Sequence, residues 1–108
     1  MIVEKLPVIP SNLQPSTHPY LNGPWTPLHE EVNAADLDVI AGVIPQDLDG
    51  VYLRTTQNQL HQPLGFFHPF EGDGMLHQIE FKDGKASYRN RFVRTRAFAA
   101  EQEAGQSL

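Results

Sequence analysis

The chain has 108 residues, enough for one small domain with a single hydrophobic core. Its 13 acidic residues outnumber the 8 basic ones, and this formal charge of -5 disfavours nucleic acid as a partner. The absence of cysteine excludes disulfides, thiolate nucleophiles and cysteine-bound metal clusters.

Residues 1–30 are rich in proline, since six of the nine prolines lie before residue 28. Each proline fixes its own φ and pushes the preceding residue towards extended backbone, so the sequence predicts an extended arm. Apolar residues such as Leu21, Trp25 and Leu28 are too many for a solvated linker. The arm is therefore expected to lie against a folded body, which is not obvious within this chain. No unbroken apolar stretch suggests a signal peptide or a membrane span, so a soluble, cytoplasmic protein is expected.

Residues 37–96 are expected to hold the strands. Residues 37–40 can form a short strand, residues 45–50 read as a turn, and residues 51–54 alternate as a half-buried strand does. Residues 55–65 carry two threonines, four amide side chains, a histidine and a proline, a composition typical of a loop.

The clearest pattern starts at Met75, where apolar and polar residues alternate as far as Lys82. The pair Asp83-Gly84 then suits a two-residue hairpin turn, which sets Ile79 opposite Tyr88 and Met75 opposite Phe92. One face of this hairpin is expected to be buried and the other exposed.

Residues 97–104 are expected to form a short helix or a connecting turn. An isolated hairpin is marginally stable and short strands leave unpaired edges, so partner strands are expected downstream of Leu108. The chain is therefore expected to be part of a longer all-β protein.

The segment Gly72-Asp73-Gly74 has too few glycines, and no following helix or lysine, to cradle a phosphate. A tight bend before a strand is the favoured interpretation, with Asp73 bonding local backbone amides.

Five histidines are spread along the chain without the short spacing that places two imidazoles on one metal: His18, His29, His61, His68 and His77. His77 is expected to be a core histidine with its hydrogen bonds satisfied. The carboxylates at Glu30, Glu31, Glu101 and Glu103 are expected to be solvated, and Arg89 and Arg91 to form surface ion pairs beside Glu80. No catalytic, cofactor-binding or metal-ligating residue is assigned within the chain.

Several segments, in order, resemble the carotenoid cleavage oxygenase family, which includes stilbene-cleaving dioxygenases and the retinoid isomerohydrolase of the eye. They are residues 20–31, the stretch 42–54 (GVIPQDLDGVYLR), residues 68–77 around Phe70-Glu71-Gly72-Asp73-Gly74-Met75, and the hairpin with its exit at 83–95. Two departures stand out. Thr55-Thr56-Gln57-Asn58-Gln59 replaces the family's usual Asn-Gly-Pro-Asn-Pro, which leaves the shape of that loop open, and Glu71 replaces an aspartate.

The resemblance implies a seven-bladed β-propeller, all-β, of which residues 1–108 form an N-terminal part: an extended arm at 1–30, and strands with a hairpin at 37–96. It implies a non-haem iron(II) dioxygenase that cleaves a conjugated double bond of a carotenoid, apocarotenoid or stilbene with dioxygen. The four histidine ligands of Fe(2+) are expected outside this chain. By the same resemblance Phe70 is a candidate for lining the substrate tunnel, and core packing is the favoured alternative. The fragment alone is expected to be inactive. Any peripheral contact with a membrane is expected to involve regions outside residues 1–108.

Two other functions stay open. One is a catalytically inactive, truncated β module with a binding or structural role. The other is an isomerohydrolase-like enzyme of the same fold, which differs in whether its products require dioxygen.

Overall fold

The computed structural model describes residues 1–65 and 68–108. These residues form an antiparallel sheet of five strands in the spatial order β1-β2-β5-β4-β3. The strands are β1 (Ile2–Lys5), β2 (Val32–Ala35), β3 (Gly50–Asn58), β4 (Asp73–Lys82) and β5 (Lys85–Phe92). Two 3₁₀ turns, η1 (Gly23–Trp25) and η2 (Pro69–Glu71), and the helix α1 (Arg96–Ala104) complete the described elements.

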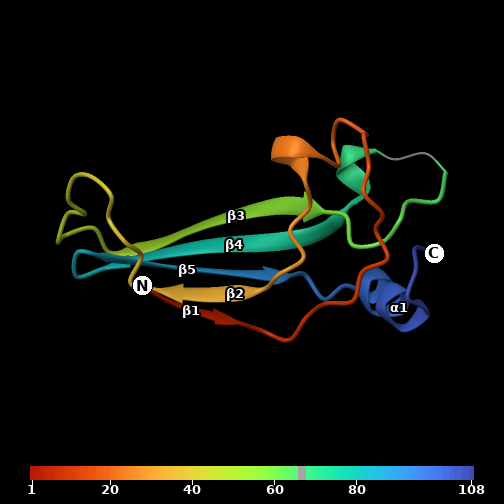
Figure 1. The fold of residues 1–108 in the computed structure, drawn as a ribbon. Coiled ribbons are helices and arrows are strands. Elements are labelled where there is room, and N and C mark those ends of the chain that lie inside the picture. The colour runs from red at the N-terminus through yellow and green to blue at the C-terminus, as the bar shows by residue number, and fades with distance from the viewer. Residues whose placement is uncertain (66–67) are drawn as a thin grey trace.

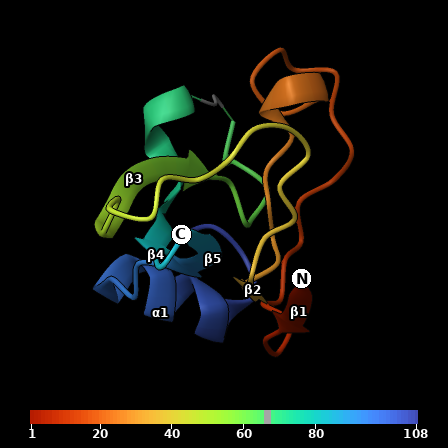
Figure 2. The same cartoon turned by 90° about the vertical axis from the view of Figure 1, so that its left-hand side faces the viewer.

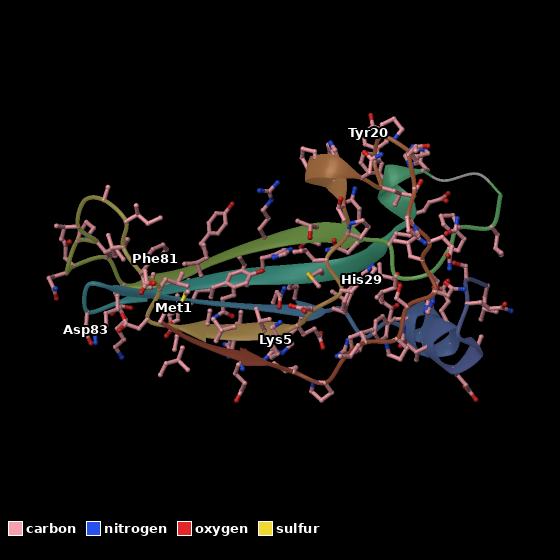
Figure 3. All side chains as sticks on the ribbon, viewed as in Figure 1. Met1, Lys5, Tyr20, His29, Phe81 and Asp83 are labelled. Atoms are coloured by element: carbon pink, nitrogen blue, oxygen red, sulfur yellow. The ribbon has the colours of Figure 1, made fainter. Side chains whose placement is uncertain are left out.

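The molecule is elongated, with principal extents of 49 × 27 × 21 Å (Figure 1). The turn between β4 and β5 and the N-terminus lie at one end, and α1 with the C-terminus lies at the other (Figure 1). Figure 3 marks this first end by Asp83 and places Tyr20 on the arm, well away from it. Viewed along the long axis, α1 lies on one side and the two 3₁₀ turns on the other (Figure 2).

The hairpin follows its sequence pattern closely. Ile79 pairs with Tyr88 and Met75 with Phe92, so the predicted register is confirmed. Asp83 and Gly84 adopt φ values of 53° and 72°, the left-handed conformation that a tight two-residue turn needs. Because side chains alternate across a strand, one face is largely withdrawn from solvent while Glu80 on the other is exposed, also as predicted.

Gly84 suits this turn because its φ is positive. A Cβ placed on it would also meet the end of the Gln46 side chain, which can move aside, so the backbone conformation is the main reason for glycine here. We expect Gly84→Ala to lower the free energy of unfolding by about 1–2 kcal/mol, measured by urea denaturation. Asp83→Asn is the matched control, because asparagine tolerates a positive φ, and it should change stability by less than about 0.5 kcal/mol. Equal losses in both variants would contradict this explanation.

The strand predicted at residues 37–40 is wrong, because the chain forms β2 earlier, at Val32–Ala35. Asp36 adopts a left-handed φ of 53° and turns the chain out of the sheet. Leu37 still donates its amide to the carbonyl of Ala86 at 2.8 Å, and the following residues form no strand. The turn predicted after them is confirmed by the Leu48 amide, which bonds the carbonyl of Pro45 at 3.2 Å.

Strand β3 is longer and more exposed than predicted. Residues 55–58, assigned to a loop, pair with β4 in unbroken register up to Asn58 with Asp73. The chain has neither glycine nor proline at 55–59, so nothing interrupts the ladder where relatives were expected to turn. Val51, Tyr52 and Leu53 are 51%, 55% and 60% exposed rather than half buried, because β3 lies at the edge of the sheet.

Asn58 at the end of β3 and Gln59 and His61 after it are buried, again in contrast to the predicted loop. Oδ1 of Asn58 accepts from the Leu28 amide at 2.8 Å and Nε2 of Gln59 donates to the His61 carbonyl at 2.7 Å, whereas Oε1 of Gln59 has no partner among the described residues. Asp73 likewise bonds far along the chain, accepting from the Leu60 amide at 3.2 Å rather than from local amides. The prediction of a local bond was therefore wrong.

The arm packs on the sheet of its own chain. Its first residues form β1, which pairs with β2, and the hydroxyl of Ser11 donates to the Leu60 carbonyl further along. The expectation of a folded body beneath the arm is thus confirmed, and that body lies within residues 1–108.

The small core sits where the arm, the sheet and α1 meet. It consists of Leu60, Met75, Phe92 and Phe98, with Ile9 of the arm packed against them. Helix α1, left open as helix or turn, is a helix: the hydroxyl of Thr95 caps its start by accepting from the Phe98 amide at 3.0 Å. None of the helices within 1–65 and 68–108 has both the length and the apolarity of a membrane span.

Candidate functional site

Phe70, the candidate tunnel residue, lies on η2 and is 82% exposed. Its ring meets the ring of His68 edge-on at 5.1 Å, and His68 Nδ1 accepts a hydrogen bond from the Phe70 amide at 3.1 Å. The favoured core-packing role is therefore wrong, because η2 places this side chain outside the core. Its place in a substrate tunnel stays a prediction.

The five histidines do not cluster in space, and each forms hydrogen bonds with different groups. His18 bonds the Tyr20 amide, His29 the Gln59 carbonyl, His61 the side chains of Asn12 and Gln102, His68 the Phe70 amide, and His77 the hydroxyls of Thr56 and Tyr88. Within residues 1–65 and 68–108 no three His, Asp or Glu side chains converge so as to hold a metal ion. These residues do not fit a four-histidine iron site.

A groove of about 540 Å³ lies between the end of the arm and strand β3. Trp25 and Leu28 line it from the arm, Arg54 and Thr56 from β3, and His77 from β4. The side chains of Arg54 and His77 share a face because these two residues are paired across the strands. The groove is therefore formed jointly by the paired strands β3 and β4 and by the end of the arm.

His77 is held from both sides of its ring. Nε2 lies 2.7 Å from the hydroxyl of Thr56 and Nδ1 lies 2.7 Å from the hydroxyl of Tyr88, so a neutral ring donates at one nitrogen and accepts at the other. Burial lowers the pKa of His77, and the nearby Arg54 guanidinium lowers it further. Burial also raises the pKa of Tyr88, which keeps its hydroxyl protonated. The predicted hydrogen bonds of His77 are therefore present, but its place in the core was wrong, because the side chain is only partly buried and lines the groove.

The lowered pKa makes stability depend on pH. Below about 6.5, the ordinary pKa of histidine, the unfolded chain takes up a proton at His77 before the folded chain does. The stabilisation from neutral His77 is therefore present above this pH and is lost as the pH falls through the folded-state pKa. We expect the loss of unfolding free energy between pH 7.5 and pH 5 to be smaller in His77→Gln than in the parent chain. Parallel pH profiles for the two chains would contradict this.

A buried carboxylate links three elements, and no motif or periodicity in the sequence indicates it. Glu31, expected to be solvated, is 3% exposed; its Oε2 accepts from the Phe92 amide and its Oε1 from Arg94 Nη2, both at 2.7 Å. Arg94 also lies over the ring of Phe98, 4.8 Å from its centre. The solvated role was wrong for Glu31, although its neighbour Glu30 is exposed.

The predicted ion pairs of Arg89 and Arg91 with Glu80 are also absent from the described residues. Arg89 donates to Gln78 Oε1 at 3.2 Å, while Arg91 donates to the Val32 carbonyl and to Asn33 Oδ1, which are parts of β2. Arg91 therefore joins two strands instead of pairing with a surface charge.

Comparison with known proteins gives consistent results. The profile of the family described as Retinal pigment epithelial membrane protein matches residues 25–108. A carotenoid cleavage oxygenase of Mycobacterium tuberculosis is 47% identical over 87 residues, which cover 79% of this chain and 17% of that protein. A probable carotenoid cleavage dioxygenase 4, chloroplastic, of Arabidopsis thaliana is 36% identical over 94 residues, covering 85% of this chain and 16% of that protein.

Comparison of this fold with solved structures points to the same family as the comparison of sequences. The crystal structure of Pseudomonas brassicacearum lignostilbene dioxygenase matches 90% of this chain with a TM-score of 0.83 and 30% identity, and the match covers 20% of that protein. The antiparallel sheet thus matches part of a carotenoid oxygenase structure, and the chain spans 16–20% of the length of these relatives. The chain belongs to the carotenoid cleavage oxygenase family, whose profile is that of Retinal pigment epithelial membrane protein.

Proposed function

We propose that residues 1–108 are part of a longer iron(II)-dependent dioxygenase that cleaves a conjugated double bond of a carotenoid, apocarotenoid or stilbene. The observation that carries this proposal is the similarity to lignostilbene dioxygenase in both fold and sequence, over 90% of this chain and 20% of that protein. The named relatives include both carotenoid-cleaving and stilbene-cleaving proteins, so the substrate class is kept this wide. Cytoplasmic location is part of the same proposal.

In this proposal the longer protein is a seven-bladed propeller, and four histidines outside residues 1–108 hold the iron. When bound, the iron would supply the activation of dioxygen, and cleavage of the double bond would yield two carbonyl products. Residues 1–108 contribute structure: the hairpin and β3 form part of the sheet, and Glu31, just before β2, bonds the Phe92 amide of β5 and Arg94, which lies over Phe98 of α1. No step of the reaction is derived through these residues.

A chimera tests the proposal. In this chimera residues 1–108 replace the matching segment of Pseudomonas brassicacearum lignostilbene dioxygenase. We expect the chimera to bind one ferrous ion per chain and to cleave a stilbene in the presence of dioxygen, and the isolated chain to do neither. A folded chimera without activity, or an isolated chain that binds iron and cleaves, would overturn the proposal.

The rival function is a β module that has a binding or structural role and no chemistry. It is favoured by one observation: the arm, the sheet and α1 share a core within this chain. Cooperative unfolding of a monodisperse isolated chain, together with an inactive chimera, would support it. Product formation by the chimera without dioxygen would instead indicate an isomerohydrolase-like reaction.

Phe70 gives a narrower test of the same proposal. Because its side chain is largely exposed, Phe70→Ala should change the stability of the isolated chain by less than about 0.5 kcal/mol. If Phe70 lines the substrate tunnel of the longer enzyme, the same substitution should raise KM or lower kcat of the chimera. Unchanged kinetics would remove Phe70 from the tunnel.

A further inference from the structure

The groove beside β3 contains a positive charge without a counter-charge. Arg54 is the charged residue among those that line it, and it forms no hydrogen bond or ion pair with any residue of 1–65 or 68–108. By contrast, Arg89, Arg91 and Arg94 each bond an oxygen of this chain. A guanidinium presents a planar fork of donors, which a carboxylate fills with two parallel hydrogen bonds.

The wall of this groove that the arm supplies contains large apolar side chains that are uncovered, while β3 supplies mostly polar ones. Trp25 is 56% exposed and Leu28 50%, although both belong to the arm that packs on the sheet. Tyr52 precedes Arg54 on the same face of β3 and is 55% exposed. Exposed large apolar side chains beside an unpaired cation are typical of a surface that another part of a protein covers.

The fraction of each relative's length that this chain matches indicates which part of the protein covers this surface. Lignostilbene dioxygenase matches residues of this chain over only 20% of its own length. The other four fifths of such a protein must contact this segment somewhere, and β3 is an edge of the sheet with exposed side chains on both faces.

We propose that the groove of Trp25, Leu28 and Arg54 is the docking surface for a segment of the longer oxygenase outside residues 1–108, one that brings a carboxylate to Arg54 and an apolar side chain against Trp25. This inference rests on the proposed function, since it requires a longer protein. Docking buries the Arg54 guanidinium and pairs it with the carboxylate at the same time, so the burial of this charge is compensated and the pair favours the matching segment.

The first test compares matched variants in two contexts. In the isolated chain Arg54→Gln should leave the midpoint of thermal unfolding unchanged, because Arg54 has no partner there. In the chimera the same substitution should lower the midpoint by roughly 2 °C or more, because a docked carboxylate loses its partner. Arg89→Gln is the control: Arg89 bonds Gln78 on the opposite face, so its loss should have the same small effect in both contexts.

The second test identifies the partner. A carbodiimide joins a lysine amine to a carboxylate in contact with it, so Arg54→Lys in the chimera should yield a cross-linked peptide from outside residues 1–108. Arg89→Lys should not yield that peptide. Mass spectrometry of the digested chimera reads out both results.

The outcomes separate the two proposals. A folded, active chimera in which Arg54→Gln has no effect and Arg54→Lys forms no such cross-link would overturn the docking surface alone, as would a cross-link confined to residues 1–108. Quenching of Trp25, the sole tryptophan of the chain, by benzoate in the isolated chain without that cross-link would make the occupant a small carboxylate. A folded, inactive chimera with the cross-link would uphold the docking surface and contradict the proposed function; an unfolded chimera would contradict both.

Discussion

Replacing Glu31 by alanine is expected to lower the free energy of unfolding by about 3 kcal/mol. The substitution leaves the buried Phe92 amide without an acceptor and removes the carboxylate partner of Arg94. The value lies at the lower end of the range for a broken buried pair, because the Arg94 side chain is 51% exposed and can turn to water. Urea denaturation followed by circular dichroism measures the effect.

The neighbouring glutamate supplies the control. Glu30 pairs with Lys5 at 3.3 Å, but both side chains are about two-thirds exposed, so Glu30→Ala should cost less than about 0.5 kcal/mol. Glu31→Gln should fall between the two, because a glutamine can still accept from the Phe92 amide but carries no charge. Similar losses for Glu31→Ala and Glu30→Ala would show that the buried carboxylate does not hold β2, β5 and α1 together.

Met75→Ala is the second substitution with a large expected effect, a loss of about 3 kcal/mol. Met75 has no exposed surface and sits at the centre of the core with Leu60, Phe92 and Phe98. Its sulfur also accepts a hydrogen bond from the side-chain Nδ2 of Asn58 at 3.4 Å, so truncation removes a weak acceptor together with the packed atoms. Thermal and urea unfolding of the variant measure the loss.

Two variants delimit that result. Met75→Leu nearly conserves volume and should cost less than about 1.5 kcal/mol, so it separates packing from the sulfur contacts. Leu76→Ala removes a comparable side chain from the exposed face of the same strand and should have a much smaller effect than Met75→Ala. If Leu76→Ala were the more damaging change, the assignment of the two faces of β4 would be wrong.

Much of the fold was predictable where the signal was local. The alternation after Met75 and the Asp83-Gly84 turn gave the hairpin with its register. The short motifs around Glu71 and in residues 42–54 gave the family, which the profile match to residues 25–108 confirmed. Phe70 was singled out from the same motif, yet its exposure could not be anticipated, since it depends on how η2 projects from the sheet.

The candidate site was less predictable, because its parts come from distant segments. Trp25 of the arm meets Arg54 of β3 only after the arm has folded back along the sheet. No periodicity marks Arg54 as unpaired, and no pattern marks Thr56 and Tyr88 as the two partners of His77. The sequence indicated that His77 would be satisfied, but not by which groups.

The sequence by itself determined the β class of the chain, its hairpin and its family, since the alternation of apolar and polar residues, the turn residues and the short motifs are local properties. Only the tertiary structure decided which polar residues are buried. Glu31 and Asn58 read as solvated groups, yet each is buried because its bonding partner comes from a segment 30 or more residues away, at Phe92 and Leu28. The position of β3 at the sheet edge was decided in the same way, because β3 pairs with β4 on one side and no strand of the described residues pairs with its other side.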